Sequence, residues 1–194
     1  LSLIFPVQNF INAVVIGFGI GINALIAFYL GAKDIKNAND IANQGFILSL
    51  IHGVVLTIGG IIIIHPFLKA FTSSESTIKL GIEYCQIVFL FTIINSLNLY
   101  FEKLFQSFGN MKITMIGLGV GCVTNILLDP VFIFGLGFVP KFGIKGAAIA
   151  TEIGQFVTFL IYLIYYLKRP TNVKIDKSYF KLTKKTIKAL YSIG

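Results

Sequence analysis

The chain has 194 residues and a net charge of +8, with 16 Lys and Arg against 8 Asp and Glu. Hydrophobic residues make up 56% of it and charged residues only 12%, about half the charged fraction of an average soluble domain. The mean hydropathy is +0.85. This composition excludes a soluble globular domain, and it excludes a nucleic-acid-binding domain, which would need a soluble basic face with aromatic residues. It predicts an all-α, polytopic integral membrane helix bundle whose surroundings are the lipid bilayer.

Five apolar stretches are long enough to cross a membrane as helices of about 20 residues. They are Phe5–Leu30, Gln44–His65, Ile78–Phe101, Ile113–Phe134 and Gly143–Leu167. The connectors between them are short, which predicts antiparallel neighbours in a bundle. Residues 168–194 are expected to be basic and cytoplasmic, as a solvated linker, an amphipathic helix on the anionic leaflet, or both.

The distribution of Lys and Arg predicts the orientation, because cytoplasmic loops are enriched in both residues. Eight of the 16 lie between Lys168 and Lys188, and the other connectors divide evenly between the two sides. The orientation therefore depends on this last segment alone. With it inside, the chain is a multi-pass protein of the plasma or inner cell membrane.

The fourth span carries Asn125 and Asp129, followed at once by Pro130. The i to i+4 spacing puts the amide and the carboxylate on one helix face. Pro130 has no N–H, so the carbonyl of Ile126 loses its usual helical partner. A carboxylate at membrane depth costs several kcal/mol, so it should face a wet cavity, a cation or a partner. These hard oxygen ligands suit a proton or a small cation and not zinc or copper, so no metal site is expected.

Small residues predict close packing between membrane helices. Gly17 and Gly21 form a GxxxG pair, and Gly117 and Gly121 form another. The small residues Gly146, Ala150 and Gly154 share one face of the fifth span. In lipid, such residues let helix backbones approach each other closely.

Three sequence patterns resemble the multidrug and toxic compound extrusion (MATE) transporters. N-x-x-x-D-P at Asn125–Pro130, with F-G and then G-x-x-G-A-A-x-A-T at Gly143–Thr151, resembles helices five and six of that family. G-I-G-I-N-A-L-I-A-x-x-L-G-A-K-D at Gly19–Asp34 resembles the end of its second helix and the next loop. F-G-N-M-K at Phe108–Lys112 resembles the turn before helix five. The order and spacing together cover nearly the whole chain.

The resemblance implies a fold of about twelve helices in two related lobes. This chain would supply helices two to six as a fragment, with residues 1–167 as part of the N-terminal lobe. The pattern is also compatible with a DinF-like branch of the family. It implies a secondary active exporter of small organic cations, working as an antiporter with Na+ or H+ as the coupling ion. No other cofactor, no catalytic residue and a monomeric full-length protein are expected. It also implies that Thr151 joins Asn125 and Asp129 around the coupling cation.

Polar stripes predict a substrate cavity. The third span presents one face that is aromatic at its outer end and amide-rich at its inner end, carrying Tyr84, Asn95, Asn98 and Glu102. Such a face would suit flat organic cations, or it could serve interhelical packing. A polar stripe on the fifth span carries Thr151, Gln155, Thr158 and Tyr162. On the first span, Gln8, Asn12 and Asn23 fall roughly on one side and could line a cavity. The cavity residues we expect are Tyr84, Asn95, Asn98, Gln155 and Thr158.

Two titratable residues within spans have roles that the sequence leaves open. His52 could be a pH switch, although a hydrogen bond to a neighbouring helix is the favoured interpretation. Glu152 falls on a third face of its helix, outside the family pattern. It is expected to pair with a lysine near the outer surface, with a second protonatable site as the alternative.

Two other functions were weighed. A flippase of lipid-linked sugars would share the fold, but it should hold Arg or Lys in its cavity for a pyrophosphate. Here Lys and Arg lie outside or at the ends of the apolar spans. A membrane-embedded enzyme would need a nucleophile–base pair or metal ligands, and the candidates His52, Asp129 and Glu152 lie on three separate spans with no motif around them.

Overall fold

A computed structural model describes the chain except for residues 1–2, 138, 170–172, 177–179, 181 and 194. Within the described residues the chain forms helices and no strand. The helices are α1 (Phe5–Gly31), α2 (Ile35–Phe71), α3 (Glu75–Leu90), α4 (Thr92–Ser107), α5 (Met111–Phe134), α6 (Ile144–Lys168) and α7 (Lys184–Ile193).

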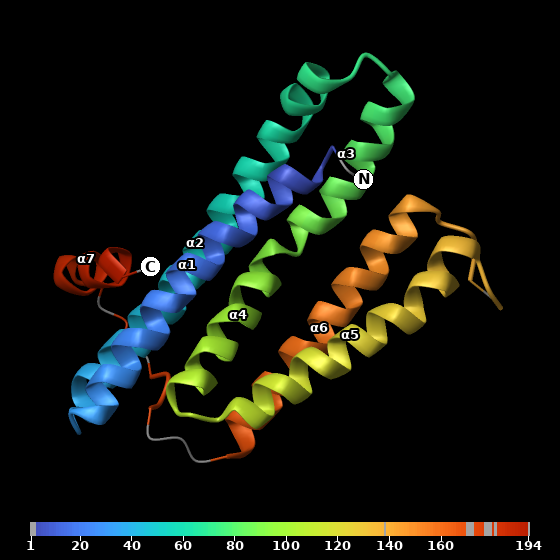
Figure 1. Cartoon of the computed structure of the whole chain (residues 1–194). Coiled ribbons are helices and arrows are strands. Elements are labelled where there is room, and N and C mark those ends of the chain that lie inside the picture. Colours follow the sequence, from blue (N-terminus) through green and yellow to red (C-terminus); the bar gives the residue numbers. More distant parts are fainter. Residues whose placement is uncertain (1–2, 138, 170–172, 177–179, 181, 194) are drawn as a thin grey trace.

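The long helices run up and down as antiparallel neighbours (Figure 1). Helices α1, α2 and α4 pack against one another, and α5 forms a hairpin with α6, which contacts α3 and α4. Four of the described helices are long and apolar enough to cross a membrane, and five spans result if α3 and α4, bent by 46°, count as one. The predicted all-α membrane bundle is therefore confirmed.

Helix α2 begins earlier than its apolar stretch, since residues 35–43 were expected to be a connector. Asp34 caps the helix, because its side chain accepts a hydrogen bond from the backbone N–H of Asn37 (3.1 Å). Ala38 and Ala42 in the added turns are fully buried. The cap and the burial of these alanines therefore extend the helix beyond the span that hydropathy alone predicts.

The third predicted span is not one straight helix but is broken at Phe91. Thr92 donates its hydroxyl to the carbonyl of Val88 (3.4 Å), a bond that bends helices. The hydroxyl of Thr57 on α2 donates to the carbonyl of Phe89 (2.8 Å). Helix α2 thus satisfies a backbone acceptor beside the break.

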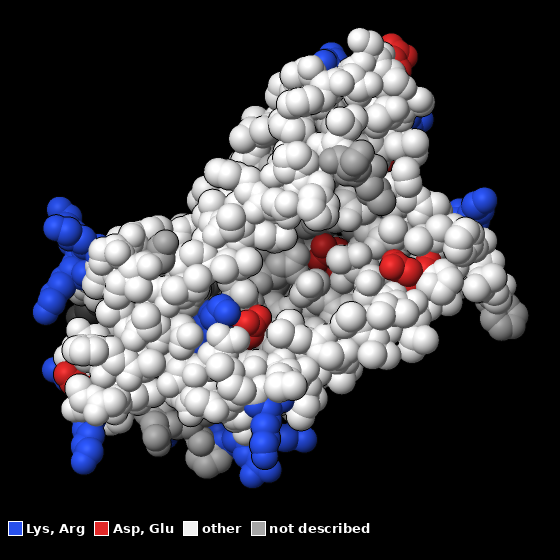
Figure 2. All heavy atoms as spheres, viewed as in Figure 1, with Lys and Arg blue, Asp and Glu red and all other residues white. Residues whose placement is uncertain are grey.

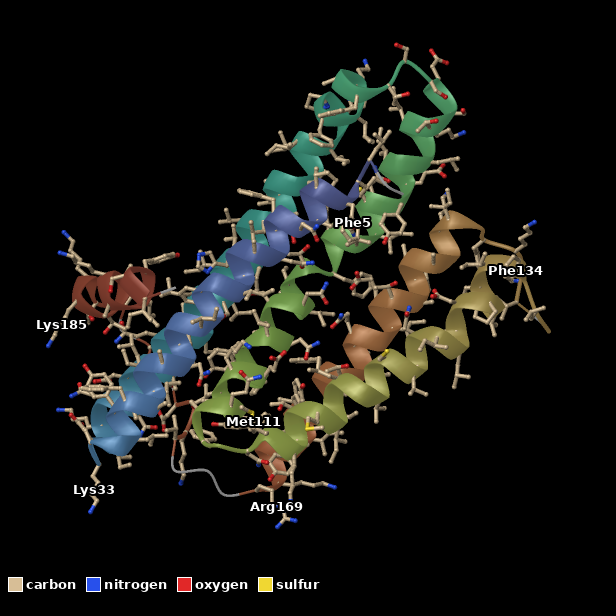
Figure 3. All side chains as sticks on the ribbon, in the orientation of Figure 1. Phe5, Lys33, Met111, Phe134, Arg169 and Lys185 are labelled. Carbon is tan, nitrogen blue, oxygen red and sulfur yellow. The ribbon has the colours of Figure 1, made fainter. Side chains whose placement is uncertain are left out.

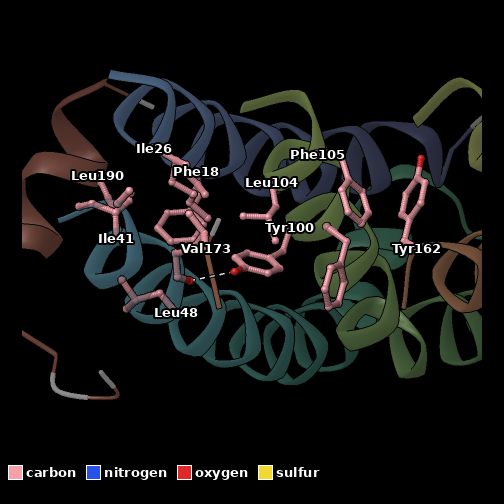
Figure 4. Close-up of a cluster of buried hydrophobic side chains, with 14 of the residues drawn as sticks. Phe18, Ile26, Ile41, Leu48, Tyr100, Leu104, Phe105, Tyr162, Val173 and Leu190 are labelled. Carbon is pink, nitrogen blue, oxygen red and sulfur yellow. Dashed lines mark hydrogen bonds between the residues drawn. The ribbon is translucent and has the colours of Figure 1, made fainter. Parts of the chain in front are cut away.

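An aromatic and aliphatic cluster holds α1, α2 and α4 together (Figure 4). The ring of Tyr100 lies in this cluster, and its hydroxyl donates to the carbonyl of Ala42 (2.9 Å). By contrast, α5 exposes apolar side chains such as Met115, which is 72% exposed. In a membrane protein an exposed apolar face of this kind suits contact with lipid or with another helix.

Glycines set the distance between α5 and α6. A Cβ atom at Gly121 would overlap the Thr158 hydroxyl, and one at Gly117 would overlap the ring of Tyr162. A Cβ at Gly154 would lie 2.7 Å from the carbonyl oxygen of Gly121. The predicted packing through small residues is confirmed.

The basic end of the bundle is well defined. Lys33 and Arg169 lie at one end, whereas Phe5 and Phe134 lie toward the other (Figure 3). In the space-filling view, Lys and Arg gather along the lower and left margins of the visible face (Figure 2). This is the end that the sequence assigns to the cytoplasm, and that side assignment stays a prediction.

Part of the basic segment 168–194 is attached to α2. The side chain of Asn43 donates to the carbonyl of Lys174 (2.8 Å) and accepts from the N–H of Asp176 (2.7 Å). Gln44 accepts from the N–H of Thr183 (2.9 Å). Helix α7 then packs on α1 and α2 with Leu190 fully buried. Lysines of this segment at positions 177 and 181 lie outside the described residues.

Candidate functional site

The predicted ion ligands lie together between α5 and α6. The side-chain amide of Asn125 is 3.5 Å from Asp129 Oδ1 and 3.3 Å from the hydroxyl oxygen of Thr151. The Thr151 hydroxyl itself donates to the carbonyl of Ala147 (2.9 Å). All three side chains are half-buried. Their role in binding a coupling ion stays a prediction.

The fold explains why these residues meet. A Cβ at Gly154 would lie 3.2 Å from the Cβ of Asn125, so the small residue brings α6 against this part of α5. Pro130 lies inside α5 directly after Asp129. The site is therefore made of side chains one helical turn apart on α5 and a hydroxyl supplied by α6.

A cavity of about 290 Å³ lies beside this site, lined by α1, the α3–α4 break, α5 and α6. Its polar lining residues are Gln8, Asn12, Thr92, Asn95, Asn98, Glu102, Thr151, Glu152 and Gln155. Figure 2 shows acidic side chains in and beside the hollow of the visible face, one of them next to a basic side chain. The volume is near the lower limit of typical small-molecule sites.

Three of the five predicted cavity residues line it, namely Asn95, Asn98 and Gln155. Asn98 donates its side-chain amide to Gln155 Oε1 (2.7 Å), which connects α4 to α6. Tyr84 is not among the lining residues and is linked to the cavity through Gln8, whose amide lies 3.4 Å from the tyrosine hydroxyl.

Thr158 was placed in the cavity by its helical stripe, and that placement is corrected. Its buried hydroxyl lies 3.1 Å from the carbonyl of Gly117 on α5 and 3.0 Å from that of Gly154. A helical wheel gives the angle between Thr158 and Gln155 but not the direction from which α5 approaches. On the first span, Gln8 and Asn12 line the cavity as expected, whereas Asn23 is not among its lining residues.

The expected lysine partner of Glu152 is also corrected. Lys145, the second residue of α6, lies 3.5 Å from Glu83 instead. Glu152 points inward, is only 2% exposed, and lies 3.5 Å from the side-chain amide of Asn95. The sequence signal for this position was only that a carboxylate lay at membrane depth. The inward direction follows from the packing of α6 on α4.

Two further charged or titratable groups have local partners. Glu102, at the inner end of the cavity, lies 3.0 Å from the ammonium of Lys103. His52 on α2 is hydrogen-bonded through Nε2 to the hydroxyl of Tyr191 on α7, and its ring contacts Phe18 edge to face. The favoured interpretation of His52, a hydrogen bond to a neighbouring helix, is confirmed.

The family model MatE matches residues 1–131. The chain belongs to the MatE family.

Curated MatE relatives cover the whole of this chain. It is 30% identical to the probable multidrug resistance protein YoeA of Bacillus subtilis and 27% identical to the multidrug export protein MepA of Staphylococcus haemolyticus. In each case the match spans 100% of this chain and 42% of the relative. The chain thus spans about two fifths of the length of these exporters.

Solved structures agree with this membership in the MatE family. An inward-facing multidrug resistance MATE transporter of the MOP superfamily superposes with a TM-score of 0.92 at 32% identity, over 99% of this chain and 43% of that one. A MOP superfamily transporter from Pyrococcus furiosus, described as having a binding pocket of reverse polarity that suggests a different function, gives 0.90 at 32% identity, covering 99% and 42%. These relatives are transporters, so the membrane-embedded enzyme is set aside. The chain is part of a multi-pass protein of the plasma membrane.

Proposed function

We propose that the full-length protein exports organic cations in exchange for Na+ or H+. The observation that carries this proposal is the charge of the cavity. Its lining, as far as the structure describes the chain, contains the carboxylates of Glu102 and Glu152 and no Lys or Arg. Lys103 neutralises Glu102, whereas neither of the two ion pairs formed by described residues includes Glu152. A hollow at membrane depth with one carboxylate outside these ion pairs favours a cation over an anion.

The site of Asn125, Asp129 and Thr151 is proposed to bind the coupling ion. A Na+ bound there would take oxygen ligands from these side chains, and a proton would bind the Asp129 carboxylate. Either event changes the hydrogen bonds between α5 and α6, next to Pro130. Thr151 also lines the cavity, so the ion site and the substrate site share a residue. Coupling follows if the ion binds the two transport conformations with different affinity.

The flippase remains the second candidate, and the cavity charge weighs against it. A lipid pyrophosphate would require Arg or Lys in the pocket, and the described lining has neither. The relatives YoeA and MepA are named for multidrug resistance and export.

The test uses the full-length protein in proteoliposomes. Efflux of an organic cation dye is followed under an imposed Na+ gradient and then under an H+ gradient, with Asp129→Asn beside the wild type. We expect one gradient to drive efflux and the variant to lose it. Asp40→Asn, on α2 outside both sites, is the matched control and should transport normally. If neither gradient moves the dye, the exporter proposal fails and flippase assays follow; full efflux by Asp129→Asn removes Asp129 from coupling.

A further inference from the structure

Three buried oxygen atoms in the cavity residues have no hydrogen-bond partner among the described residues. They are Asn95 Oδ1, Asn98 Oδ1 and Glu152 Oε1, here called the acceptor cluster. All three residues line the same cavity. A buried acceptor without a donor costs free energy, and a charged one costs more. Three such acceptors in one cavity favour a ligand that carries hydrogen-bond donors.

The orientation of the two amides follows from their other contacts. The Nδ2 atom of Asn95 lies 3.5 Å from Glu152 Oε2, and that of Asn98 lies 2.7 Å from Gln155 Oε1. Turning either amide around would place one acceptor against another. The donors are therefore used between α4 and α6, and the acceptor oxygens are left over.

Neither ion pair between described residues includes Glu152. The nearest lysine along α6, Lys145, is paired with Glu83 at 3.5 Å, and Lys103 is paired with Glu102 at 3.0 Å. Of the proposed ion site only Thr151 lines the cavity, and Thr151 is not a member of the acceptor cluster. A buried carboxylate that keeps its charge requires a cation near it.

We propose that the acceptor cluster selects cations that carry N–H groups. A primary ammonium has three donors and one positive charge, which matches three acceptors of which one is anionic. A quaternary ammonium of similar size has the charge but no donor, so its binding leaves the acceptors unpaired. The inference rests on the proposed function, because it names the class of cation that the cavity takes. Sites built around hydrogen bonds reject ligands that lack the donors more strongly than apolar sites reject a change in size.

The test is equilibrium binding to the purified full-length protein, with no gradient present. The probes are 4-phenylbutylammonium and its N,N,N-trimethyl analogue, which share the same apolar group. We expect the wild type to bind the primary ammonium roughly 10-fold tighter or more. Glu152→Gln should weaken both probes because it removes the charge, and it should weaken the primary ammonium more because a charge-assisted hydrogen bond is also lost, so the preference shrinks. Asn98→Leu, which removes one acceptor and no charge, should reduce the preference in part.

The control is Glu83→Gln, which removes a carboxylate of the surface pair with Lys145 and should change neither affinity. Thermal unfolding of each variant shows whether it is folded. Equal wild-type affinities for the two probes, or an unchanged preference in Glu152→Gln, would overturn the inference. If Glu152→Gln lost Na+ binding but kept both ammonium affinities, the inference would also be overturned, and the acceptor cluster would be an alkali-cation site. A protein that shows the preference but no gradient-driven efflux would refute the exporter and leave this inference standing.

Discussion

The side-chain amide of Asn95 on α4 lies 3.5 Å from the carboxylate of Glu152 on α6. The preceding residue, Thr151, accepts instead from Asn125 on α5. Successive residues of a helix differ by about 100° in direction. Two successive residues of α6 therefore contact two different helices. Thr151 faces α5 in the proposed ion site, and Glu152 faces α4 in the acceptor cluster. The two sites can be altered separately.

The ion site can be probed with a matched pair of threonines. Thr151 and Thr124 each donate to the carbonyl four residues earlier, at 2.9 and 2.8 Å, but only Thr151 also accepts from Asn125. Thr151→Val should lower the apparent affinity for the coupling ion by roughly 10-fold, the value of one hydrogen bond near a charge. Thr124→Val should not. The measurement is the ion dependence of dye efflux in proteoliposomes, and equal effects of the two variants would contradict the assignment of Thr151.

The close contact of α5 and α6 predicts opposite effects at two glycines of α5. A Cβ at Gly121 would overlap Thr158, whereas one at Gly119 would meet nothing within 4 Å. Gly121→Ala should lower the free energy of unfolding by roughly 1–3 kcal/mol through overpacking. Gly119→Ala should be neutral or stabilising by up to about 1 kcal/mol, since alanine favours helix. Thermal unfolding in detergent measures both, and an equally stable Gly121→Ala would mean that the two helices are further apart.

The cap of α2 predicts a pH dependence. The backbone N–H of Asn37, and then its side-chain amide, hold the pKa of the Asp34 carboxyl below its usual value of 3.8. A lowered pKa means that the carboxylate stabilises the fold at pH values above 3.8, and that this contribution is lost as the pH falls through the lower, folded-state value. Asp34→Ala should therefore lower the unfolding temperature at pH 7, and the difference should shrink in acid. The control is Asp40→Ala, and a difference that stays constant with pH would contradict the cap.

The attachment of the basic segment to α2 predicts graded protease sensitivity. Asn43 makes two hydrogen bonds to the backbone at Lys174 and Asp176, and Asn39 accepts one from the N–H of Lys174. Loss of these bonds should release the chain near Lys174. Trypsin should cut there faster in Asn43→Ala than in Asn39→Ala, and slowest in the wild type. Equal cleavage of all three proteins would show that the segment is already free.

The sequence by itself determined that this is an all-α membrane bundle, and it placed Asn125 and Asp129 on one face of a helix next to Pro130. Both results follow from rules within one segment. A span needs about 20 apolar residues, and residues four apart share a helix face in any environment. The pairing of small residues was also predictable, because Gly117 and Gly121 have the spacing that close packing needs.

Only the tertiary structure decided which face meets which neighbour. The helical wheel placed Thr158 on the same face as Gln155 and Glu152 on a separate face. In the packed structure Thr158 contacts α5, and Glu152 lines the cavity. The bend at Phe91 likewise depends on Thr57 of α2, which is distant in sequence. Periodicity defines directions within a helix, whereas the rotation and height of one helix relative to another come from contacts between segments far apart in the chain. The acceptor cluster is such a product, since its members come from α4 and α6.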